Sequence, residues 1–564
     1  MNNPPQQKQA TPASKEKGLE GALTKKLSEI QLEKIKEDAM ALAQGLGLPF
    51  ISLLGYPIDT DAMGLIKESE ARSGQMIVLS KDGNNLKVAV VNPENGLTKD
   101  IIRKLESKGL ECSVLISSST DMTKALERYK DLKKLDKVHL GVIGITESEI
   151  TELQKSIQGI GDLKEKLSSV PIGQVLNVIL AGALKIEASD IHFENEEKML
   201  HLRYRVDGVL TDVTNFALAG YDKLLNRVKL MSGLKINIHN QPQDGRFTIR
   251  LNNSDMEVRV SVIPSEYGEN IVMRILNPLT IKQKLEDLGM RDSALETVKK
   301  LLEKTTGSII TTGPAGSGKT TTLYAFIRHI NNPEIKIITI EDPIEYHIQG
   351  ITQTQVNEGA GYTFANGLRS IVRQDPDVIL VGEIRDGETA EIAMQAALTG
   401  HQVFSTLHAN NASGAIPRLI DLGVKPITIS PAVNATIAQR LVRKLCSKCK
   451  IKKKITQEDL TRMIKILNIE IIKKEGLKEP DENTEVYYPS QCSECNQTGY
   501  KGRIGLFEIF EIDKDIEKLI QTSPAMTDVE DLAEKKGMIS LLQDGFIKVL
   551  DGMTSVEEVE RVAG

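Results

Sequence analysis

Several residue types are scarce in this 564-residue sequence, and their scarcity narrows the class of protein. The sequence has no Trp, and aromatic residues make up only 4% of it. Channels for single-stranded nucleic acid combine basic grooves with aromatic side chains on which bases stack. The formal net charge of −6 also gives no general attraction to nucleic acid. We therefore expect no nucleic-acid partner.

Long apolar runs are missing as well. Residues 1–18 are polar and contain no apolar stretch of the kind that a signal peptide needs. The longest uncharged run, 167–184, includes Ser, Pro, Gln and Asn, and its apolar residues fall on one helical face. This pattern predicts a core helix and no membrane span.

Cysteines are few, and four of the five stand in two pairs, Cys446-x-x-Cys449 and Cys492-x-x-Cys495. Such pairs fit a reduced compartment and a metal better than a disulfide framework. Four thiolates can close a tetrahedral Zn²⁺ site without an open position, which makes the site structural. The 42 residues between the pairs exceed the gap of a compact zinc ribbon, so the spacing alone does not decide whether the four cysteines form a zinc site. The fifth cysteine, Cys112, is predicted to be a buried apolar residue.

The length predicts several domains, because a single hydrophobic core stops growing at about 250–300 residues. Alternating and helical patterns suggest two α/β or α+β regions before a parallel α/β core. Within the second region, Asp207-Gly208 and Asp244-Gly245 predict tight turns between strands. We expect a disordered tail (1–20), a small N-terminal domain (21–145), a helical linker (146–166), a second N-terminal domain (167–278), a parallel α/β core (279–440), a tetracysteine subdomain (441–508) and a helical C-terminal region (509–564).

Residues 313–320 read GPAGSGKT, a full match to the phosphate-binding pattern GxxxxGK[ST]. A strand-like run (308–312) precedes this loop and a helix-like run (320–328) follows it, which disfavours a chance Gly-rich turn. Backbone N–H groups of such a loop face phosphate oxygens at a helix N-terminus. Lys319 should reach the β- and γ-phosphates, and the Thr320 hydroxyl should bind Mg²⁺. The predicted nucleotide-binding residues are Gly313, Pro314, Ala315, Gly316, Ser317, Gly318, Lys319, Thr320 and Thr321.

Three further strand-like runs end in polar residues. One run ends at Glu383, another ends in the acidic cluster that contains Glu345, and the third ends at His408. Parallel strands of an open sheet place their carboxyl ends at one edge, where ligands bind. A carboxylate there can position water for attack on a phosphate. Taken singly, these features also fit a surface acid after a buried strand, a solvated acidic turn and a structural histidine.

Together, these motifs resemble one protein family. The loop GPAGSGKT, EDPIEY (341–346), DPDVILVGEIRD (375–386) and TGHQVFSTLHAN (399–410) resemble the type II/IV secretion ATPases. Similarity extends to ASDIHFE (188–194), RYRVDGVL (203–210), PQDGR (242–246), VRVSVIPSEYGENIVMRIL (258–276), AQRLVRKLC (438–446) and GRIGLFEIFEI (502–512). It is strong from about residue 171 onward and weak before it. The pattern is most similar to the assembly ATPases of type IV pili and type II secretion (general secretion pathway E-type).

The resemblance implies a fold and roles for single residues. It implies a RecA-like P-loop ATPase core, a preceding α+β (PAS-like) domain, a small N-terminal α/β domain, a zinc-binding insert and a helical C-terminal tail. Glu345 would be the catalytic glutamate of the Asp box, Glu383 the Walker B glutamate and His408 a sensor. The family arginines that project toward the nucleotide correspond to Arg246, Arg259 and Arg274. Cross-strand ion pairing on a solvated sheet face is the alternative for these arginines.

The resemblance also implies a cytoplasmic homo-hexamer at the inner membrane that hydrolyses ATP with Mg²⁺ and carries structural Zn²⁺. Its partner would be an inner-membrane platform protein, and membrane association would be peripheral. A retraction or DNA-transfer motor and a non-hydrolysing scaffold remain as alternatives. Many N-terminal domains of the family bind a cyclic dinucleotide through an Arg-Leu-Gly-bearing repeat, which residues 21–145 lack. We therefore expect docking, and no such binding, from this domain.

Overall fold

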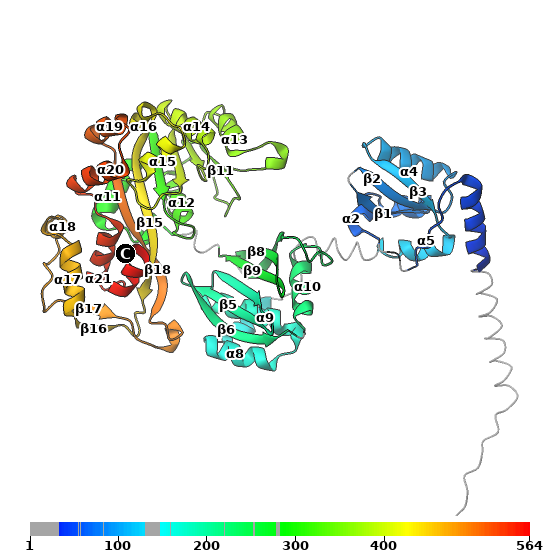
Figure 1. Ribbon diagram of the computed structural model, residues 1–564, viewed down its shortest axis with the longest axis horizontal. Coiled ribbons are helices and arrows are strands. Elements are labelled where there is room, and N and C mark those ends of the chain that lie inside the picture. Colours follow the sequence, from blue (N-terminus) through cyan, green and yellow to red (C-terminus); the bar gives the residue numbers. More distant parts are fainter. Residues whose placement is uncertain are drawn as a thin grey trace, which may run out of the picture. The chain divides into compact units, whose positions relative to one another are not determined.

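The computed structural model describes residues 33–129 and 147–564, apart from 55, 57, 83, 158, 219, 252–253 and 278–282. The chain divides into two compact units, Met1–Val142 and Ile143–Gly564 (Figure 1). The tail expected over 1–20 lies outside the described residues.

The first unit contains a three-stranded sheet of β1 (Met76–Asp82), β2 (Asn85–Val90) and β3 (Glu111–Ile116). The pair β1–β2 is antiparallel and β2–β3 is parallel. Its helices include α2 (Thr60–Met63), α3 (Glu68–Gly74), α4 (Gly96–Glu106) and α5 (Ser119–Leu126), and residues 33–46 are helical as well. This arrangement confirms the predicted α/β character. Cys112 is half-buried and packs against the core of this unit, and burial raises the pKa of its thiol.

The second unit begins with a six-stranded antiparallel sheet in the order β6-β5-β4-β9-β8-β7. Its strands are β4 (Asp190–Asn195), β5 (Met199–Val206), β6 (Val209–Ala217), β7 (Gln243–Leu251), β8 (Ser254–Ser265) and β9 (Gly268–Leu276). The predicted core helix is α9 (Ile172–Ile186), which buries Leu176, Ile179 and Leu180. A further helix, α10 (Tyr221–Met231), contributes to the same hydrophobic core.

The segment expected to be a linker, 146–166, forms α7 (Glu147–Lys155) and most of α8 (Ile160–Ser169). Both helices contact α9 and bury Ile150 and Leu163 in the core of the six-stranded sheet. Leu163 packs so closely on Gly182 that a Cβ there would lie 2.6 Å from Leu163 Cδ1. This segment therefore belongs to the packed domain, although its many charged residues predict only a connection.

The two predicted turns have different outcomes. Asp207-Gly208 joins β5 to β6 with positive φ angles of 49° and 85°, as expected for a tight hairpin turn. The turn predicted at Asp244-Gly245 is wrong, because both residues lie within β7. Gly245 is needed there for close packing, since a Cβ would lie 2.3 Å from the Ser232 carbonyl oxygen.

A seven-stranded sheet forms the centre of the remaining chain, in the order β12-β11-β13-β14-β10-β15-β18. All neighbouring pairs are parallel except β15–β18, as predicted for a parallel α/β core. The strands are β10 (Gly307–Thr312), β11 (Ile337–Glu341), β12 (Thr352–Gln355), β13 (Val378–Val381), β14 (Gln402–Leu407), β15 (Val433–Leu445) and β18 (Tyr500–Glu511).

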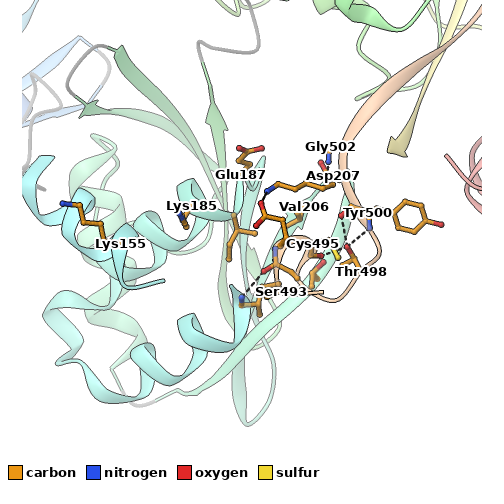
Figure 2. A pocket seen from close by; sticks show the side chains of 16 residues that line it. Lys155, Lys185, Glu187, Val206, Asp207, Ser493, Cys495, Thr498, Tyr500 and Gly502 are labelled. Atoms are coloured by element: carbon orange, nitrogen blue, oxygen red, sulfur yellow. Dashed lines mark hydrogen bonds and ion pairs between the residues drawn. The ribbon is translucent and has the colours of Figure 1, made fainter. Parts of the chain in front are cut away.

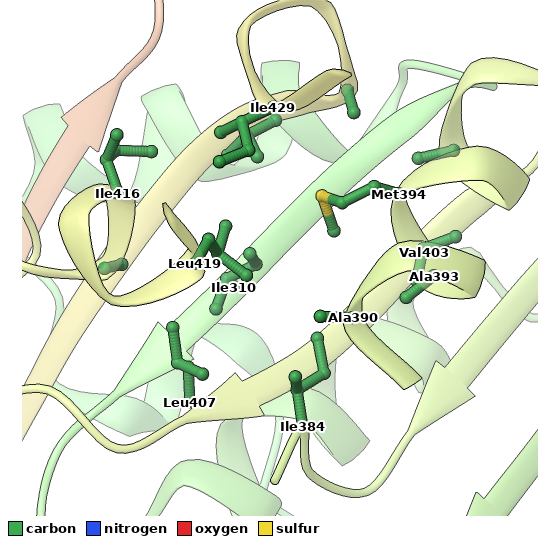
Figure 3. Packing of buried hydrophobic residues seen from close by; sticks show 14 of the residues in the cluster. Ile310, Ile384, Ala390, Ala393, Met394, Val403, Leu407, Ile416, Leu419 and Ile429 are labelled. Carbon is green, nitrogen blue, oxygen red and sulfur yellow. The ribbon is translucent and has the colours of Figure 1, made fainter. Parts of the chain in front are cut away.

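Helices cover both faces of this sheet. Successive residues of a strand point to opposite sides, so neighbouring residues pack against different helices. Ile309 of β10 packs in one cluster with α11 and α12, whereas Ile310 packs in another with α14–α16 (Figure 3). Both faces of β10 are thus buried, as its continuous apolar sequence requires. The helices are α11 (Asp292–Leu302), α12 (Lys319–Ile330), α13 (Phe364–Val372), α14 (Gly387–Leu398), α15 (Ala415–Asp421) and α16 (Pro426–Ala432), with short 3-10 turns at Leu285–Leu288 and Glu358–Ala360.

An excursion between β15 and β18 carries the cysteine pairs. It contains β16 (Ile451–Lys454), α17 (Gln457–Ile466), α18 (Ile469–Lys474), β17 (Glu485–Tyr488) and a 3-10 turn at Ser493–Cys495. The helices α19 (Lys514–Gln521), α20 (Met526–Lys535), α21 (Leu541–Leu550) and α22 (Val556–Ala563) follow β18. Over the described part of the chain, no helix has the length and apolarity needed to cross a membrane.

Candidate functional site

The phosphate loop lies between β10 and the N-terminus of α12. Gly313 and Gly318 have positive φ angles of 142° and 88°. A Cβ at Gly313 would lie 2.5 Å from the Gln439 carbonyl oxygen, so only glycine fits between the loop and β15. The buried Ser317 hydroxyl has no hydrogen-bond partner among the described residues. The loop therefore leaves polar groups for a ligand at a helix N-terminus, where an anion is favoured.

Lys319 lies across this loop. Its ammonium group donates hydrogen bonds to the carbonyl oxygens of Gly313 (2.7 Å) and Pro314 (3.0 Å). Burial lowers the pKa of Lys319, and the negative charge of Glu383 opposes this shift. A cavity of about 690 Å³ opens beside the loop and is lined in part by residues 313–315 and His408. A phosphate bound there would offer Lys319 an anionic partner, which a charged donor binds more strongly than a carbonyl.

Glu383 and His408 meet at the carboxyl ends of β13 and β14. The Thr406 hydroxyl donates to the Gly382 carbonyl oxygen over 2.9 Å and holds the two strand ends together. The Glu383 carboxylate lies 3.6 Å from His408 Nε2 and 2.5 Å from Arg385 Nη2. The structure thus brings Glu383 and His408, which were predicted to be the Walker B glutamate and a sensor, to the edge that carries Lys319.

The acids clustered between 341 and 345 separate into three environments. Glu341 is buried, with only 3% of the residue exposed. Asp342 lies 3.5 Å from Arg385, and Glu345 lies 2.8 Å from Arg259 Nη1. Burial raises the pKa of Glu345, an effect that the nearby charge of Arg259 partly offsets. A carboxylate with a raised pKa is better suited to accept a proton than an ordinary surface acid.

The three predicted arginines are cross-strand neighbours in the six-stranded sheet. Arg259 of β8 stands opposite Arg246 of β7 and opposite Arg274 of β9. Like charges directly opposite each other destabilise a sheet, so such a row requires nearby anions. Glu257 and Asp190 supply part of this compensation within the same sheet.

Among the described residues, Arg259 is the one of the three that forms a hydrogen bond or ion pair with the ATPase-like core, whereas Arg274 acts on the pKa of Glu345 through its charge. Arg259 reaches Glu345 and also donates to the Ile344 carbonyl oxygen over 2.9 Å. Arg246 is 75% exposed and lies 3.6 Å from Glu257, and Arg274 is 63% exposed and lies 2.9 Å from Asp190. The latter two thus form the ion pairs that were the alternative interpretation, and their approach to a nucleotide stays a prediction.

The four paired cysteines converge. Their sulfur atoms all lie within 4.8 Å of one another, with Sγ–Sγ distances of 3.8 Å for Cys446–Cys492, 3.8 Å for Cys449–Cys495 and 3.6 Å for Cys492–Cys495. A tetrahedral site with Zn–S bonds of about 2.3 Å has S–S edges of about 3.8 Å. Burial and the neighbouring thiols raise the pKa of Cys449 to about 12, so a cation is needed to hold all four as thiolates. The donor set fits Zn²⁺.

The long gap between the cysteine pairs is explained by the fold. Cys446 directly follows β15, and Cys495 stands shortly before β18, its antiparallel neighbour. The Cys446 amide donates to the Gly499 carbonyl oxygen over 2.9 Å. The pairs are therefore adjacent wherever β15 and β18 pair, whatever the length of the excursion. The lysines of β16 beside them pair locally, as in Lys452–Glu485, which fits a solvated surface.

A cavity of about 470 Å³ lies between the segment around Cys495 and the second domain (Figure 2). At its border the Gly502 amide donates to the Asp207 carboxylate over 2.9 Å. The Ile160 amide, at the start of α8, donates to the Asn496 side-chain oxygen over 3.3 Å. The segment that includes and follows Cys495 thus contacts the domain that carries Arg259.

Sequence reasoning missed several residues of this site. Arg385 follows Glu383 by two residues, and the run of alternating charges around it was the available signal. Arg440 of β15 donates to the Asn410 carbonyl oxygen over 3.2 Å and steadies the segment after His408. No local pattern indicates that Gln353 binds Glu341.

Comparison with known proteins identifies the family of this chain. The family model described as type II/IV secretion system protein matches residues 165–561, and the MshEN domain model matches 46–135. Type II secretion system protein E of Aeromonas hydrophila is 42% identical over 416 residues, which are 74% of this chain and 80% of that protein. The type IV pilus assembly ATPase PilB of Thermus thermophilus is 36% identical over 536 residues, 94% of this chain and 58% of the relative. The solved ATPase DotB of Legionella pneumophila aligns with a TM-score of 0.49 at 22% identity, covering 68% of this chain and 94% of that one. The chain belongs to the type II/IV secretion ATPase family.

Proposed function

We propose that this chain forms a hexameric ring that hydrolyses ATP and drives assembly of a type IV pilus or of a type II secretion pseudopilus. One observation carries the proposal. A complete phosphate loop with Lys319 shares a sheet edge with the Glu383–His408 pair, and Glu345, in the loop that follows β11, contacts an arginine from another domain.

Each residue of this edge has a role in the proposed hydrolysis. Lys319 would neutralise charge on the β- and γ-phosphates, and Glu345 would orient the attacking water and accept its proton. Glu383 would be held in place by Arg385 and would hold His408 near the γ-phosphate. Mg²⁺, held through the exposed Thr320 hydroxyl, would balance the phosphate charge.

Arg259 would couple hydrolysis to motion. Its guanidinium comes from the second domain and bonds Ile344 and Glu345 in the core. An arginine delivered by a movable domain stabilises developing charge only while the site is closed. Nucleotide binding and release would then favour different domain positions, which is the basis of a mechanical stroke.

The names of its relatives support the proposed pathway. Matching proteins are named for type II secretion and for type IV pilus assembly. The ring would act at the cytoplasmic side of the inner membrane, bound peripherally through a platform protein, with no nucleic-acid partner. A retraction or DNA-transfer motor is the alternative within the family, and the tetracysteine cluster favours assembly, because retraction ATPases usually lack this insert. A non-hydrolysing scaffold would not need Lys319, Glu345 and Glu383 together.

Deletion of the gene tests the pathway. Loss of an assembly motor should abolish surface filaments or protein secretion, whereas loss of a retraction motor should leave cells with more filaments.

Complementation of the deletion with Lys319→Ala then distinguishes an ATP-driven motor from a non-hydrolysing scaffold. The variant should fail to restore filaments or secretion, because the lysine is needed for phosphate binding. Restoration by this variant would favour the scaffold.

The Arg259–Glu345 pair predicts a pH effect. Glu345 must be ionised to act as a base, and the charge of Arg259 lowers the pKa that burial has raised. In Arg259→Ala the pKa of Glu345 should rise further, so the acidic limb of the kcat/KM profile should move to higher pH. Steady-state phosphate release across a pH series measures the shift. Lys223→Ala, which removes an exposed charge from the same domain, should leave the limb in place.

A further inference from the structure

The buried Glu341 has no function in the mechanism above, although its side chain is among the most constrained near the site. It ends β11 and is 3% exposed. The Thr339 hydroxyl donates to its carboxylate over 2.7 Å, the Gln353 amide over 3.1 Å, and the Tyr324 hydroxyl through a short hydrogen bond. Among the described residues it forms no ion pair. Burying a carboxyl group among neutral donors costs free energy of folding, so we expect such a group to contribute to function.

Gln353 connects Glu341 to the loop that carries Glu345. Its Nε2 donates to Glu341 and to the Tyr346 carbonyl oxygen (2.9 Å), and its Oε1 accepts from the Ile348 amide at 2.7 Å. The Ile348 N–H is a donor only, which fixes the orientation of the Gln353 amide. Glu341 thus presents the acceptor that the other end of this amide requires.

Tyr324 connects the same carboxyl group to the phosphate loop. It belongs to α12, the helix that begins at Lys319. Burial, followed by the charge of Glu341, raises the pKa of Tyr324, so the phenol stays a hydrogen-bond donor. Glu341 is therefore bonded both to the helix behind the phosphate loop and, through Gln353, to the loop behind Glu345.

We infer that Glu341 is a positioning residue, which sets Glu345 relative to the phosphates through Gln353 and Tyr324. This inference rests on the proposed role of Glu345 as the group that orients the attacking water. Loop 342–348 lies between two anchors, Gln353 on one side and Arg259 on the other. Of these two, Gln353 belongs to the same domain as the phosphate loop, as does Arg385, which lies 3.5 Å from Asp342 at the start of the loop. Gln353 would keep Glu345 in place whether or not Arg259 is engaged.

The variant Glu341→Gln tests this inference in the full-length protein. Its amide would place a donor against the Tyr324 hydroxyl or the Gln353 amide, and a turned Gln353 would no longer accept from Ile348. We expect kcat for ATP hydrolysis to fall about 10- to 100-fold, as small misplacements of catalytic groups cause. Affinity for a fluorescent ATP analogue should stay within about threefold of wild type, because the phosphate loop is untouched. An unchanged kcat, or an equal loss of binding, would overturn the inference.

Two further variants separate positioning from general damage. Gln353→Leu should lower kcat similarly, which keeps the test valid if Glu341→Gln fails to fold. The matched control Gln355→Leu, at an exposed position of the same strand, should behave as wild type. In a Glu345→Gln background, Glu341→Gln should cause little further loss, since residues that act as a unit are not additive. A full additional loss there would mean that Glu341 acts independently of Glu345.

These outcomes also separate this inference from the proposed function. If Glu345→Gln alone keeps wild-type turnover, the catalytic assignment fails and the inference fails with it. If Glu345→Gln is inactive while both Glu341→Gln and Gln353→Leu turn over normally, only the positioning role is wrong.

Discussion

Glu345→Gln should lower kcat for ATP hydrolysis by about 10²- to 10⁴-fold, the contribution typical of a positioned general base. Glutamine preserves the shape of the side chain but cannot accept the proton of the attacking water. The change also removes the charge that Arg259 faces at 2.8 Å. Nucleotide binding should persist, because Lys319 and the loop amides are unchanged. Phosphate release and titration with a fluorescent nucleotide measure the two quantities separately.

The control for this experiment is Glu334→Gln, a neutralised acid at an exposed position shortly before β11. It should retain wild-type turnover. Retained turnover in Glu345→Gln with lost turnover in Glu383→Gln would assign the base to Glu383 instead. Both carboxylates contact an arginine, but burial raises the pKa of Glu345, which favours Glu345 as the proton acceptor.

Much of the ATPase core could be predicted because its signals are local. The phosphate loop needs specific glycines, and the apolar runs of β10 and β13 are buried on both faces of the sheet. Parallel pairing then places the strand ends at one edge, which brings Glu383 and His408 together as expected from the order of motifs. The cysteine cluster could be predicted in the same way, because paired cysteines are rare and distinctive in a sequence.

The sequence alone does not show which of several residues of the same type takes a given role. Glu341 and Glu345 stand four positions apart in one acidic segment, and only packing against Tyr324 makes the first a buried anchor. The arginines were similar in kind, but cross-strand register decides that Asp190 holds Arg274 while Arg259 reaches Glu345. Gly245 shows the same limit. The Asp-Gly pair predicted a turn, but Gly245 lies within β7, where it packs closely against Ser232. Such outcomes depend on distant neighbours, which no local pattern specifies.

Cys492→Ser should abolish stoichiometric zinc binding, with bound zinc falling from one ion per chain to nearly none. A serine hydroxyl stays protonated and is a poor replacement for the thiolate that Zn²⁺ prefers. A ligand bound at about 1,000 times its Kd stabilises the fold by about 4 kcal/mol. One kcal/mol shifts Tm by about 2–4 °C in a domain of 150–250 residues, so Tm should fall on the order of 10 °C. Elemental analysis and calorimetry measure both effects.

The matched control is Cys112→Ser, which alters the one cysteine outside the cluster and should leave the zinc content unchanged. Loss of zinc should also destabilise the structure beyond the cysteines, because the Tyr500 hydroxyl lies 2.7 Å from Ser555 Oγ and the Gly502 amide donates to the Asp207 carboxylate. Amide exchange should therefore accelerate across residues 495–502 and at the start of α22 in Cys492→Ser. A protein that keeps its zinc, its Tm and its exchange protection in this variant would show that the four sulfurs do not form a metal site. An identical loss caused by a chelator in the wild type, reversed by added Zn²⁺, would instead trace these effects to the ion itself.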